Sequence, residues 1–254
     1  MSFTIHAACH CHTGYVRKNN EDNFFFDDLS LQERNAGLSA PLTLTAPTDQ
    51  RRVLAVFDGM GGESNGETAA FVAAKALFSG LHGIDCEGDG DFSYEAARQM
   101  NLEVWRTALS LRTDRMGATL AMLTFREDHV YACNLGDSRI FRLRDGKLHQ
   151  LSKDHTDEAF LKSQGIVRRP RLTQFLGMNP EEFQADPHVA GFFVQPGDWY
   201  LICSDGLTDM LDPGTMAGTL LSAENPVQCA QRLVDAALEK GGRDNITVIV
   251  CTVE

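Results

Sequence analysis

Short apolar runs separated by polar segments along the chain predict many short strands. Several of these runs carry β-branched and aromatic residues and are bounded by Gly, Asp or Asn, as strands of a packed sheet are. These predicted strands cover residues 53–57, 118–125, 130–134, 139–143, 199–203 and 246–253. Between two apolar runs, Asp145-Gly146 predicts a tight hairpin turn, because both residues tolerate a positive φ.

Helical periodicity occurs in three places. The first helix is predicted after a polar opening around Asn65, and the second is predicted to follow Ser93. The third has the clearest ends, with Asn225 as N-cap, Pro226 at the first helical position and Gly241 just past the last turn. Apolar residues line one face of each helix: Ala69, Ala70, Ala73, Ala74, Leu77 and Leu81; Ala97, Val104, Ala108 and Leu111; and Val227, Ala230, Leu233, Val234, Ala237 and Leu238.

The order of these elements predicts an α+β fold. The strands come in adjacent hairpin-like pairs and the helices in blocks, which favours mainly antiparallel sheets over a doubly wound parallel sheet. Because no linker, repeat or low-complexity segment divides the 254 residues, we expect one domain over residues 1–254.

Composition and charge narrow the possible partners and the compartment. The formal net charge of −12 argues against nucleic acid or an anionic membrane as the main partner, since both require a basic surface. The seven cysteines are scattered and several lie in apolar runs, which suits a reducing cytosol better than a disulfide framework. Neither a signal peptide in the first residues nor a run of roughly 18 apolar residues is present. We therefore expect a cytoplasmic protein without a membrane anchor.

Acidic residues stand at the ends of the predicted strands. Asp58 follows the run 53–57, Asp205 follows the run 199–203, and Asp244 precedes the last strand by two residues. Glu21 and Asp22 stand just before an aromatic run at 24–26. Each of these carboxylates is therefore expected at the rim of a buried strand, where its backbone is held in place.

Carboxylates in such positions suit divalent cations. Mg²⁺ and Mn²⁺ prefer carboxylate, carbonyl and water oxygens, and two such ions ~3.5–4 Å apart can promote phosphoryl transfer to water. Gly59 lets its carbonyl approach an ion, and Arg17 has the planar fork that binds phosphate oxygens. Each residue alone has a plainer interpretation, a turn for Asp-Gly and a solvated side chain for Arg17, and spacing does not show that the set converges.

Read in order, seven segments resemble the metal-dependent Ser/Thr protein phosphatases of type 2C (the PPM family), especially its bacterial branch. They include Val56-Phe57-Asp58-Gly59-Met60-Gly61-Gly62 and Cys203-Ser204-Asp205-Gly206. In full, the segments cover residues 14–22, 56–62, 114–120, 134–139, 151–155, 203–209 and 242–248. One such segment alone is a weak signal, whereas seven in the family's order are specific.

The resemblance implies a four-layer α/β/β/α sandwich of two antiparallel sheets flanked by helices, with metals in a cleft at one end. It implies that Asp58 bridges two core ions, Mn²⁺ or Mg²⁺. By the same resemblance, Asp205 and Asp244 also bind one of these ions, while Glu21 and the Gly59 carbonyl bind the other. Asp22 would hold a metal-bound water, Arg17 would hold the substrate phosphate, and Asp114, Asp205 and Asp209 match a third, weaker metal position.

The activity implied by the resemblance is that of a protein-serine/threonine phosphatase. A metal-bound water would attack the phosphorus of phosphoserine or phosphothreonine directly, with no phosphoenzyme. The implied partners are phosphoproteins, which would be a bacterial Ser/Thr kinase or its substrates, and we expect a monomer.

Two departures from the family pattern bear on this interpretation. Met60 stands where many eukaryotic members have a histidine proposed as general acid, and a thioether cannot donate a proton. The segment at about 155–190 is shorter than the family's usual flap, which is linked to substrate choice and metal affinity.

Other functions remain open on the sequence. A catalytically dead member that only binds phosphoproteins would be expected to lose at least one of Asp58, Asp205 and Asp244, yet all three are present. A hydrolase of small phosphorylated metabolites would share the site chemistry but would be expected to have a closed pocket. Zinc at Cys9, His10, Cys11 and His12 is disfavoured, because alternate strand residues point to opposite faces. We interpret His155 as a structural histidine rather than a general acid.

Overall fold

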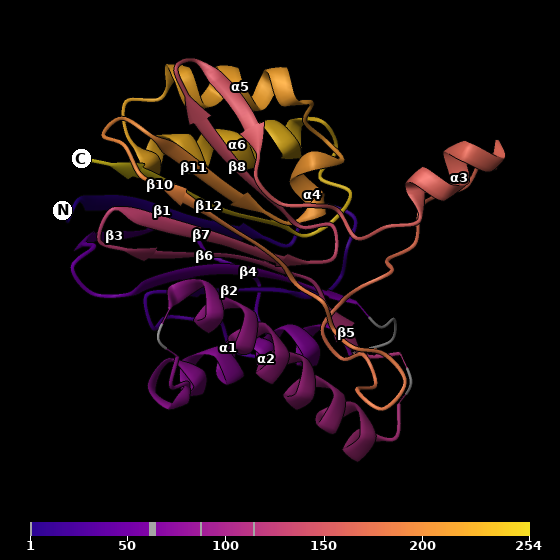
Figure 1. The fold of residues 1–254 in the computed structure, drawn as a ribbon. Coiled ribbons are helices and arrows are strands. Elements are labelled where there is room, and N and C mark those ends of the chain that lie inside the picture. Colours follow the sequence, from indigo (N-terminus) through magenta and orange to yellow (C-terminus); the bar gives the residue numbers. More distant parts are fainter. Residues whose placement is uncertain (1, 61–64, 87, 114) are drawn as a thin grey trace.

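The structure, a computed structural model, describes residues 2–60, 65–86, 88–113 and 115–254. Two antiparallel sheets pack face to face, and helices cover the outer face of each sheet (Figure 1). This arrangement confirms the predicted α+β class and the four-layer α/β/β/α sandwich. Within the described ranges, no helix is long and apolar enough to cross a membrane.

The first sheet contains both ends of the chain. Its strand order is β3-β1-β12-β11-β8-β9, so the final strand lies at its centre. The strands are β1 (Thr4–His12), β3 (Leu42–Pro47), β8 (Arg139–Arg144), β9 (Lys147–Gln150), β11 (Trp199–Cys203) and β12 (Ile246–Val253). Its outer face is covered by α4 (Asp205–Thr208), α5 (Pro213–Ser222) and α6 (Pro226–Glu239).

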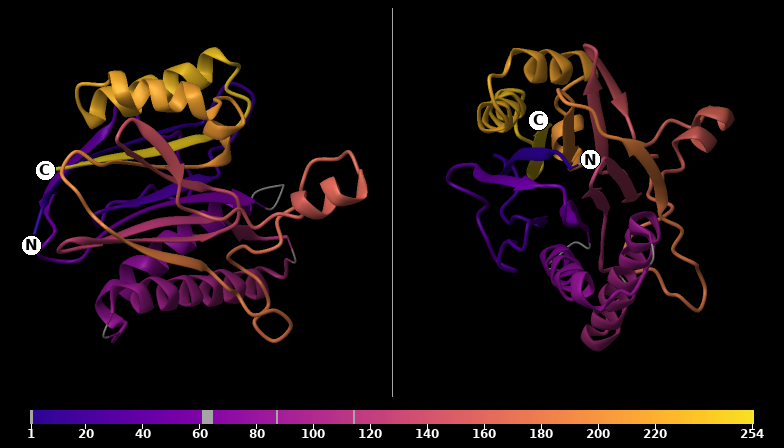
Figure 2. Two further views of the ribbon diagram at one scale, coloured as in Figure 1. Left: turned by 45° about the horizontal axis from the view of Figure 1, so that its top comes forward. Right: turned by 60° about the vertical axis from the view of Figure 1, so that its left-hand side comes forward.

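The second sheet has the order β10-β7-β6-β4-β2, with the short β5 paired to the end of β4. Its strands are β2 (Asp22–Phe26), β4 (Arg52–Met60), β5 (Gly117–Ala118), β6 (Leu120–Arg126), β7 (His129–Leu135) and β10 (His188–Phe193). The long helices α1 (Gly66–Gly83) and α2 (Asp89–Leu111) lie against its outer face (Figure 2).

Three apolar clusters fill the spaces between the four layers. The middle cluster lies between the two sheets and includes the edge-to-face pair Phe125 and Tyr200, whose ring centroids are 5.4 Å apart. The outer clusters pack α1 and α2 on one sheet and α5 and α6 on the other. Cys9 and Cys11 point into the middle cluster, in keeping with the predicted alternation of faces along β1. Each sheet is thus buried on both faces, which explains why most of its strands are continuous apolar runs.

Most predicted elements are confirmed with small shifts in their ends. The predicted strands at 199–203 and 246–253 coincide with β11 and β12. The Asp145-Gly146 turn connects β8 to β9 with φ values of 52° and 72°. Asn225 is the N-cap of α6, where its side chain accepts a hydrogen bond from the Gln228 amide at 2.9 Å.

Two predicted boundaries were wrong. The helix expected after Ser93 begins at Asp89, and the buried Ser93 hydroxyl donates to the Asp89 carbonyl inside the helix. The strand expected over 118–125 is interrupted at Thr119, whose amide donates to the Asp58 carbonyl and not to a regular ladder partner.

The predicted flap region contains one helix that projects from the sandwich. Residues Thr156 and Leu172 form an isolated bridge, and the chain between them carries α3 (Glu158–Gln164) outward (Figures 1 and 2). After this excursion the chain returns to the second sheet, where Leu176 bridges Ala118. The role of this segment as a flap, and the extent of the domain, stay predictions.

A buried carboxylate stabilises the end of the sandwich where β8 ends and β11 begins. Asp198 is 1 % exposed and accepts hydrogen bonds from Arg144 Nε at 2.6 Å and from the Tyr200 hydroxyl at 3.0 Å. Asp198 Oδ2, the oxygen that accepts from Tyr200, also accepts a hydrogen bond from Gln195 N at 3.0 Å. Because the carboxylate is paired on several sides, its burial is tolerated.

We predict that Asp198→Ala lowers the free energy of unfolding by about 3–5 kcal/mol, because it leaves the Arg144 guanidinium and the Tyr200 hydroxyl buried without their partner. Denaturant unfolding of the variant measures this loss. The N-cap variant Asn225→Ala, which exposes one amide at a helix end, should lose only about 1 kcal/mol. Equal losses in the two variants would contradict the importance assigned to Asp198.

Candidate metal centre and phosphate cleft

The sheet registers bring the predicted site residues to one end of the sandwich. In the second sheet, Asp22 lies directly opposite Asp58 on the neighbouring strand. In the first sheet, β11 ends at Cys203 beside Val248 near the start of β12, which places Asp205 close to Asp244. Five carboxylates that are far apart in sequence therefore gather at the same edge. The sequence alone did not establish this convergence.

The buried Asp22 carboxylate connects the two sheets at this end. Its Oδ2 accepts hydrogen bonds from the Ser204 hydroxyl at 2.8 Å and from the Thr247 hydroxyl at 2.7 Å. Asp22 is only 2 % exposed, and it is the first residue of β2, at the rim of a buried strand. Ser204 and Thr247 adjoin Asp205 and the start of β12, so this contact fixes the distance between the two sheets at the site.

The backbone around Asp58 is fixed by its neighbours. Asp58 N donates to the Thr119 hydroxyl at 3.1 Å, and Thr119 N donates back to the Asp58 carbonyl at 2.8 Å. The Thr119 hydroxyl also shares a hydrogen bond of 2.6 Å with the Ser138 hydroxyl. These contacts explain the interruption between β5 and β6, because Thr119 leaves the regular ladder to hold Asp58.

Gly59 lies where the backbone of two other segments comes very close. Its amide donates to the Glu21 carbonyl at 3.1 Å. A Cβ at this position would stand 2.5 Å from that carbonyl oxygen and closer still to the Gly66 carbonyl. No side chain fits there, so only glycine lets β4 meet Glu21 and the start of α1.

One asparagine that was not predicted as a site residue holds the loop carrying Arg17 and Glu21. Asn245 accepts a hydrogen bond from Glu21 N at 2.7 Å and donates to the carbonyls of Thr13 and Asn19 at 2.8 and 2.9 Å. The loop positions Arg17, whose Nη2 donates to Asp244 Oδ2 at 2.6 Å. The sequence signals for Asn245 were its place directly after Asp244 and within the segment 242–248 that resembles the family.

Two of the gathered carboxylates, Asp205 and Asp244, line a cleft of about 740 Å³ together with Arg17. On its solvent side, Arg169 reaches from the segment after α3 to Asp205, with Nη2 3.0 Å from Oδ2, and lies 3.5 Å from Asp209. The side chains of Arg169 and Asp209 are 71 % and 56 % exposed, while that of Asp205 is 17 % exposed. The cleft therefore opens to solvent at the Arg169 rim.

The pKa values of the carboxyl groups reflect their crowding. Burial raises the pKa of Asp58 well above its usual range, and the nearby charges of Asp205 and Asp22 raise it further. Burial, followed by the charge of Asp137, raises the pKa of Asp205 to about 6. Burial also raises the pKa of Asp22 to about 7, although its two hydroxyl partners oppose the shift. Carboxylates this close favour a positive charge between them.

The donor set suits divalent cations, although its members do not converge as they stand. Across the described ranges, no three Asp, Glu, His or Cys side chains meet closely enough to hold a metal ion. Two of the carboxylates are instead paired with guanidinium groups, Asp244 with Arg17 and Asp205 with Arg169. The oxygen donors, the raised pKa values of Asp22, Asp58 and Asp205, and the absence of a side chain at Gly59 all fit a Mg²⁺ or Mn²⁺ centre that would replace these pairings.

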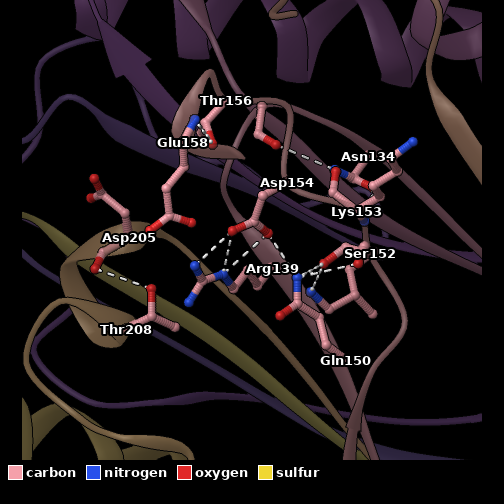
Figure 3. A network of polar contacts seen from close by, with 12 residues as sticks. Asn134, Arg139, Gln150, Ser152, Lys153, Asp154, Thr156, Glu158, Asp205 and Thr208 are labelled. Atoms are coloured by element: carbon pink, nitrogen blue, oxygen red, sulfur yellow. Dashed lines mark hydrogen bonds and ion pairs between the residues drawn. The ribbon is translucent and has the colours of Figure 1, made fainter. Parts of the chain in front are cut away.

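Further charged residues of the cleft were not predicted as site residues. Asp137 lines the cleft. Arg139 donates to Asp154 Oδ2 from Nη2 at 2.6 Å and from Nε at 3.0 Å, and its Nε also lies 3.2 Å from Asp154 Oδ1 (Figure 3). Gln150 donates to Asp154 Oδ1 at 2.7 Å. Asp137 and Arg139 belong to a segment that was matched to the family, which was the available signal. Asp114, predicted at a third metal position, lies outside the described residues.

The chain matches known proteins along its whole length. The family model for protein phosphatase 2C matches residues 43–238. The serine/threonine protein phosphatase PstP of Mycobacterium tuberculosis is 32 % identical over 273 aligned residues, which take in 100 % of this chain and 46 % of PstP. The chain thus spans about half the length of that relative. A serine/threonine phosphatase of Listeria innocua is 27 % identical over 97 % of this chain and 95 % of its own length.

The fold is also found among solved structures. The catalytic domain of PstP, solved in complex with two manganese ions, superposes with a TM-score of 0.78 and 28 % identity, covering 100 % of this chain and 99 % of that domain. The family model covers well over half of the chain, the relative above 30 % identity covers all of it, and the fold agrees. The chain therefore belongs to the protein phosphatase 2C family.

Proposed function

We propose that this chain is a metal-dependent phosphatase that removes phosphate from phosphoserine and phosphothreonine residues of proteins. The observation that carries the proposal is that the strand registers bring Glu21, Asp58, Asp205 and Asp244 to one end of the sandwich, beside Arg17. Family membership and the phosphatase relatives support the same activity.

Asp58 would bridge two divalent ions, with Asp205 and Asp244 on one and Glu21 and the Gly59 carbonyl on the other. Mn²⁺ is favoured by the PstP domain in complex with two manganese ions, and Mg²⁺ suits the same oxygen donors. When bound, such ions activate water as a nucleophile and neutralise charge on the phosphate. Asp205, Asp209 and Asp114 would form a third, weaker position.

The remaining groups of the cleft would bind and orient the phosphate. Arg17 is 48 % exposed at the cleft wall and presents its planar fork to solvent on the side not used by Asp244. Asn245 would act as a positioning residue, because it holds the loop that carries Arg17. Asp22 would orient the attacking water, as its position beside Asp58 in the sheet allows.

General-acid catalysis by a protein side chain has little support in this cleft. The Met60 thioether has no proton to donate. His155 is held structurally, because its Nδ1 accepts a hydrogen bond from Gly136 N at 3.2 Å, and burial lowers its pKa. The leaving alkoxide would therefore take its proton from solvent in the cleft.

The exposed rim favours proteins over small metabolites as substrates. Arg169 and Asp209 are more than half exposed, so a phosphorylated side chain carried on a polypeptide can approach without a closed pocket around it. We propose a cytoplasmic monomer that acts on phosphoproteins and opposes a Ser/Thr kinase. The complete set of acidic residues disfavours a binding-only protein.

The proposed activity predicts phosphate release from a phosphothreonine peptide and from p-nitrophenyl phosphate in the presence of Mn²⁺ or Mg²⁺. Excess EDTA should abolish release, because the carboxylates alone do not activate water. Folded protein that releases no phosphate with either metal would move the assignment to a phosphoprotein-binding module.

Asp58→Asn should lower the rate of metal-dependent phosphate release by at least about a hundredfold while the protein stays folded. The amide removes the negative charge that both ions would share, so calorimetric titration with Mn²⁺ should show weakened binding. Asp145→Asn, the same change at an exposed turn, serves as the matched control. Wild-type turnover and Mn²⁺ stoichiometry in Asp58→Asn would refute the bridging role.

The Arg169 pairing predicts competition between a guanidinium and the metal. Arg169→Gln should tighten Mn²⁺ binding by about two- to five-fold, because the cation no longer has to displace a partly exposed ion pair from Asp205. Calorimetry measures the affinity directly, without turnover. Arg168→Gln is the control, since Arg168 pairs with Asp157 and not with Asp205. Equal affinities in the two variants would show that Arg169 does not compete.

A further inference from the structure

A second cavity, which we call the apolar groove, lies next to the cleft that contains Arg17 and Arg169. It has no role in the proposed chemistry. It has a volume of about 990 Å³ and is lined mainly by apolar side chains, among them Met60, Trp105, Leu109, Phe175 and Phe183. One wall is the C-terminal half of α2, and the other is the chain that returns from α3 toward β10.

Side chains pack closely around Gly117 at the floor of the apolar groove. Met60 at the end of β4 pairs with Gly117 in β5. A Cβ on Gly117 would stand 2.8 Å from Phe175 Cδ2 and 2.9 Å from Met60 Cε, so these two side chains meet over the glycine. The methionine that replaces the histidine of many eukaryotic members is therefore part of an apolar surface, which gives it a packing role.

The apolar groove borders the cleft that contains Arg17 and Arg169. Met60 directly follows Gly59, the residue whose carbonyl we assign to the metal centre. On the other side, Arg169 and Pro170 line the charged cleft, while the next two residues, Arg171 and Leu172, line the apolar groove. One short segment thus separates the two cavities, and a polypeptide bound in the cleft can extend from one into the other.

Large apolar side chains at the rim of the groove are open to solvent. Leu109 is 56 % exposed and Phe183 is 55 % exposed, and within the described ranges no segment of the chain covers them. Apolar cavities with exposed rims of this kind are typical of ligand and peptide sites. Met60 of the groove is the residue after Gly59 of the proposed metal centre, and an extended peptide advances ~3.3 Å per residue, so a few residues of substrate would connect the two places.

We propose that the apolar groove binds an apolar side chain of the phosphoprotein substrate, located within about three residues of the phosphorylated residue. This inference rests on the proposed phosphatase function and adds a determinant of substrate choice. Met60, Trp105 and Phe183 would contact that side chain, and the phosphate would lie beside Arg17. The occupant is the substrate polypeptide itself, because the groove borders, at residues 169–172, the cleft that would hold its phosphate.

The test uses a series of phosphothreonine peptides, each with leucine or aspartate at one position. The varied position runs from three residues before the phosphothreonine to three residues after it. At the position that reaches the groove, leucine should raise kcat/KM about tenfold or more over aspartate, mainly through a lower KM. Leu109→Asp and Phe183→Asp should reduce this leucine-to-aspartate ratio to near one. Leu221→Asp is the matched control, because Leu221 is 59 % exposed on α5 at the opposite face of the molecule.

Binding can be measured separately from turnover. The chain has two tryptophans, so Trp199→Phe leaves Trp105 as the only indole, inside the groove. In excess EDTA, the leucine peptide should shift the Trp105 emission and the aspartate peptide should not. A turnover preference for leucine without an emission change would place the apolar side chain elsewhere and overturn the proposal.

Turnover of p-nitrophenyl phosphate distinguishes a failure of the groove assignment from a failure of the phosphatase assignment. If the wild-type protein hydrolyses p-nitrophenyl phosphate but shows no preference among the peptides, the groove assignment fails and the phosphatase assignment stands. If neither p-nitrophenyl phosphate nor any peptide is hydrolysed with Mn²⁺ or Mg²⁺, both assignments fall together. The leucine preference, its loss in both groove variants and its retention in Leu221→Asp would together support the proposal.

Discussion

The buried contact between Asp22 and the hydroxyls of Ser204 and Thr247 is the interaction on which the site depends. It connects the two sheets at the end where the strands carrying Asp58, Asp205 and Asp244 terminate or turn. The sandwich core holds the sheets together by nonspecific burial, whereas this contact fixes their spacing at one edge. Two hydroxyl donors also offset part of the cost of burying the carboxylate.

A site of this kind concentrates negative charge, and the protein compensates for it in two ways. Arg17 and Arg169 pair with Asp244 and Asp205, while burial and then the neighbouring carboxylates raise the pKa values of Asp22, Asp58 and Asp205. Divalent ions would supply the missing positive charge. The same crowding that opposes folding without metal would thus favour metal binding, as linkage between the two requires.

Much of this architecture could be predicted from local signals. The strands at 199–203 and 246–253 and the helix capped by Asn225 follow from apolar runs, turn residues and a cap. The start of α2 was misplaced, because Ser93 resembles a cap in sequence but lies buried inside the helix. The helix α5 was not predicted, although Asp212 caps it and Pro213 opens it in the same way as the pair at α6.

For the candidate site, local signals in the sequence could identify residues but not which of them lie close together. The residue types and the family resemblance identified Asp58, Asp205 and Asp244, but only the registers of β2, β4, β11 and β12 bring them together. Asn245 and Arg139 act through contacts with distant segments, which leave no periodic signal in the chain. The apolar groove likewise joins α2, β4 and the segment after α3, so no single stretch of sequence reveals it.

The central claim is that these carboxylates hold paired divalent ions at one end of the sandwich. A crystal of the protein soaked with Mn²⁺ and measured at the manganese absorption edge tests it most directly. The account predicts two anomalous peaks flanking Asp58, one beside Asp205 and Asp244 and the other beside Glu21, with the Arg169 side chain released from Asp205. Peaks only at other surface carboxylates, or none at saturating Mn²⁺, would contradict it.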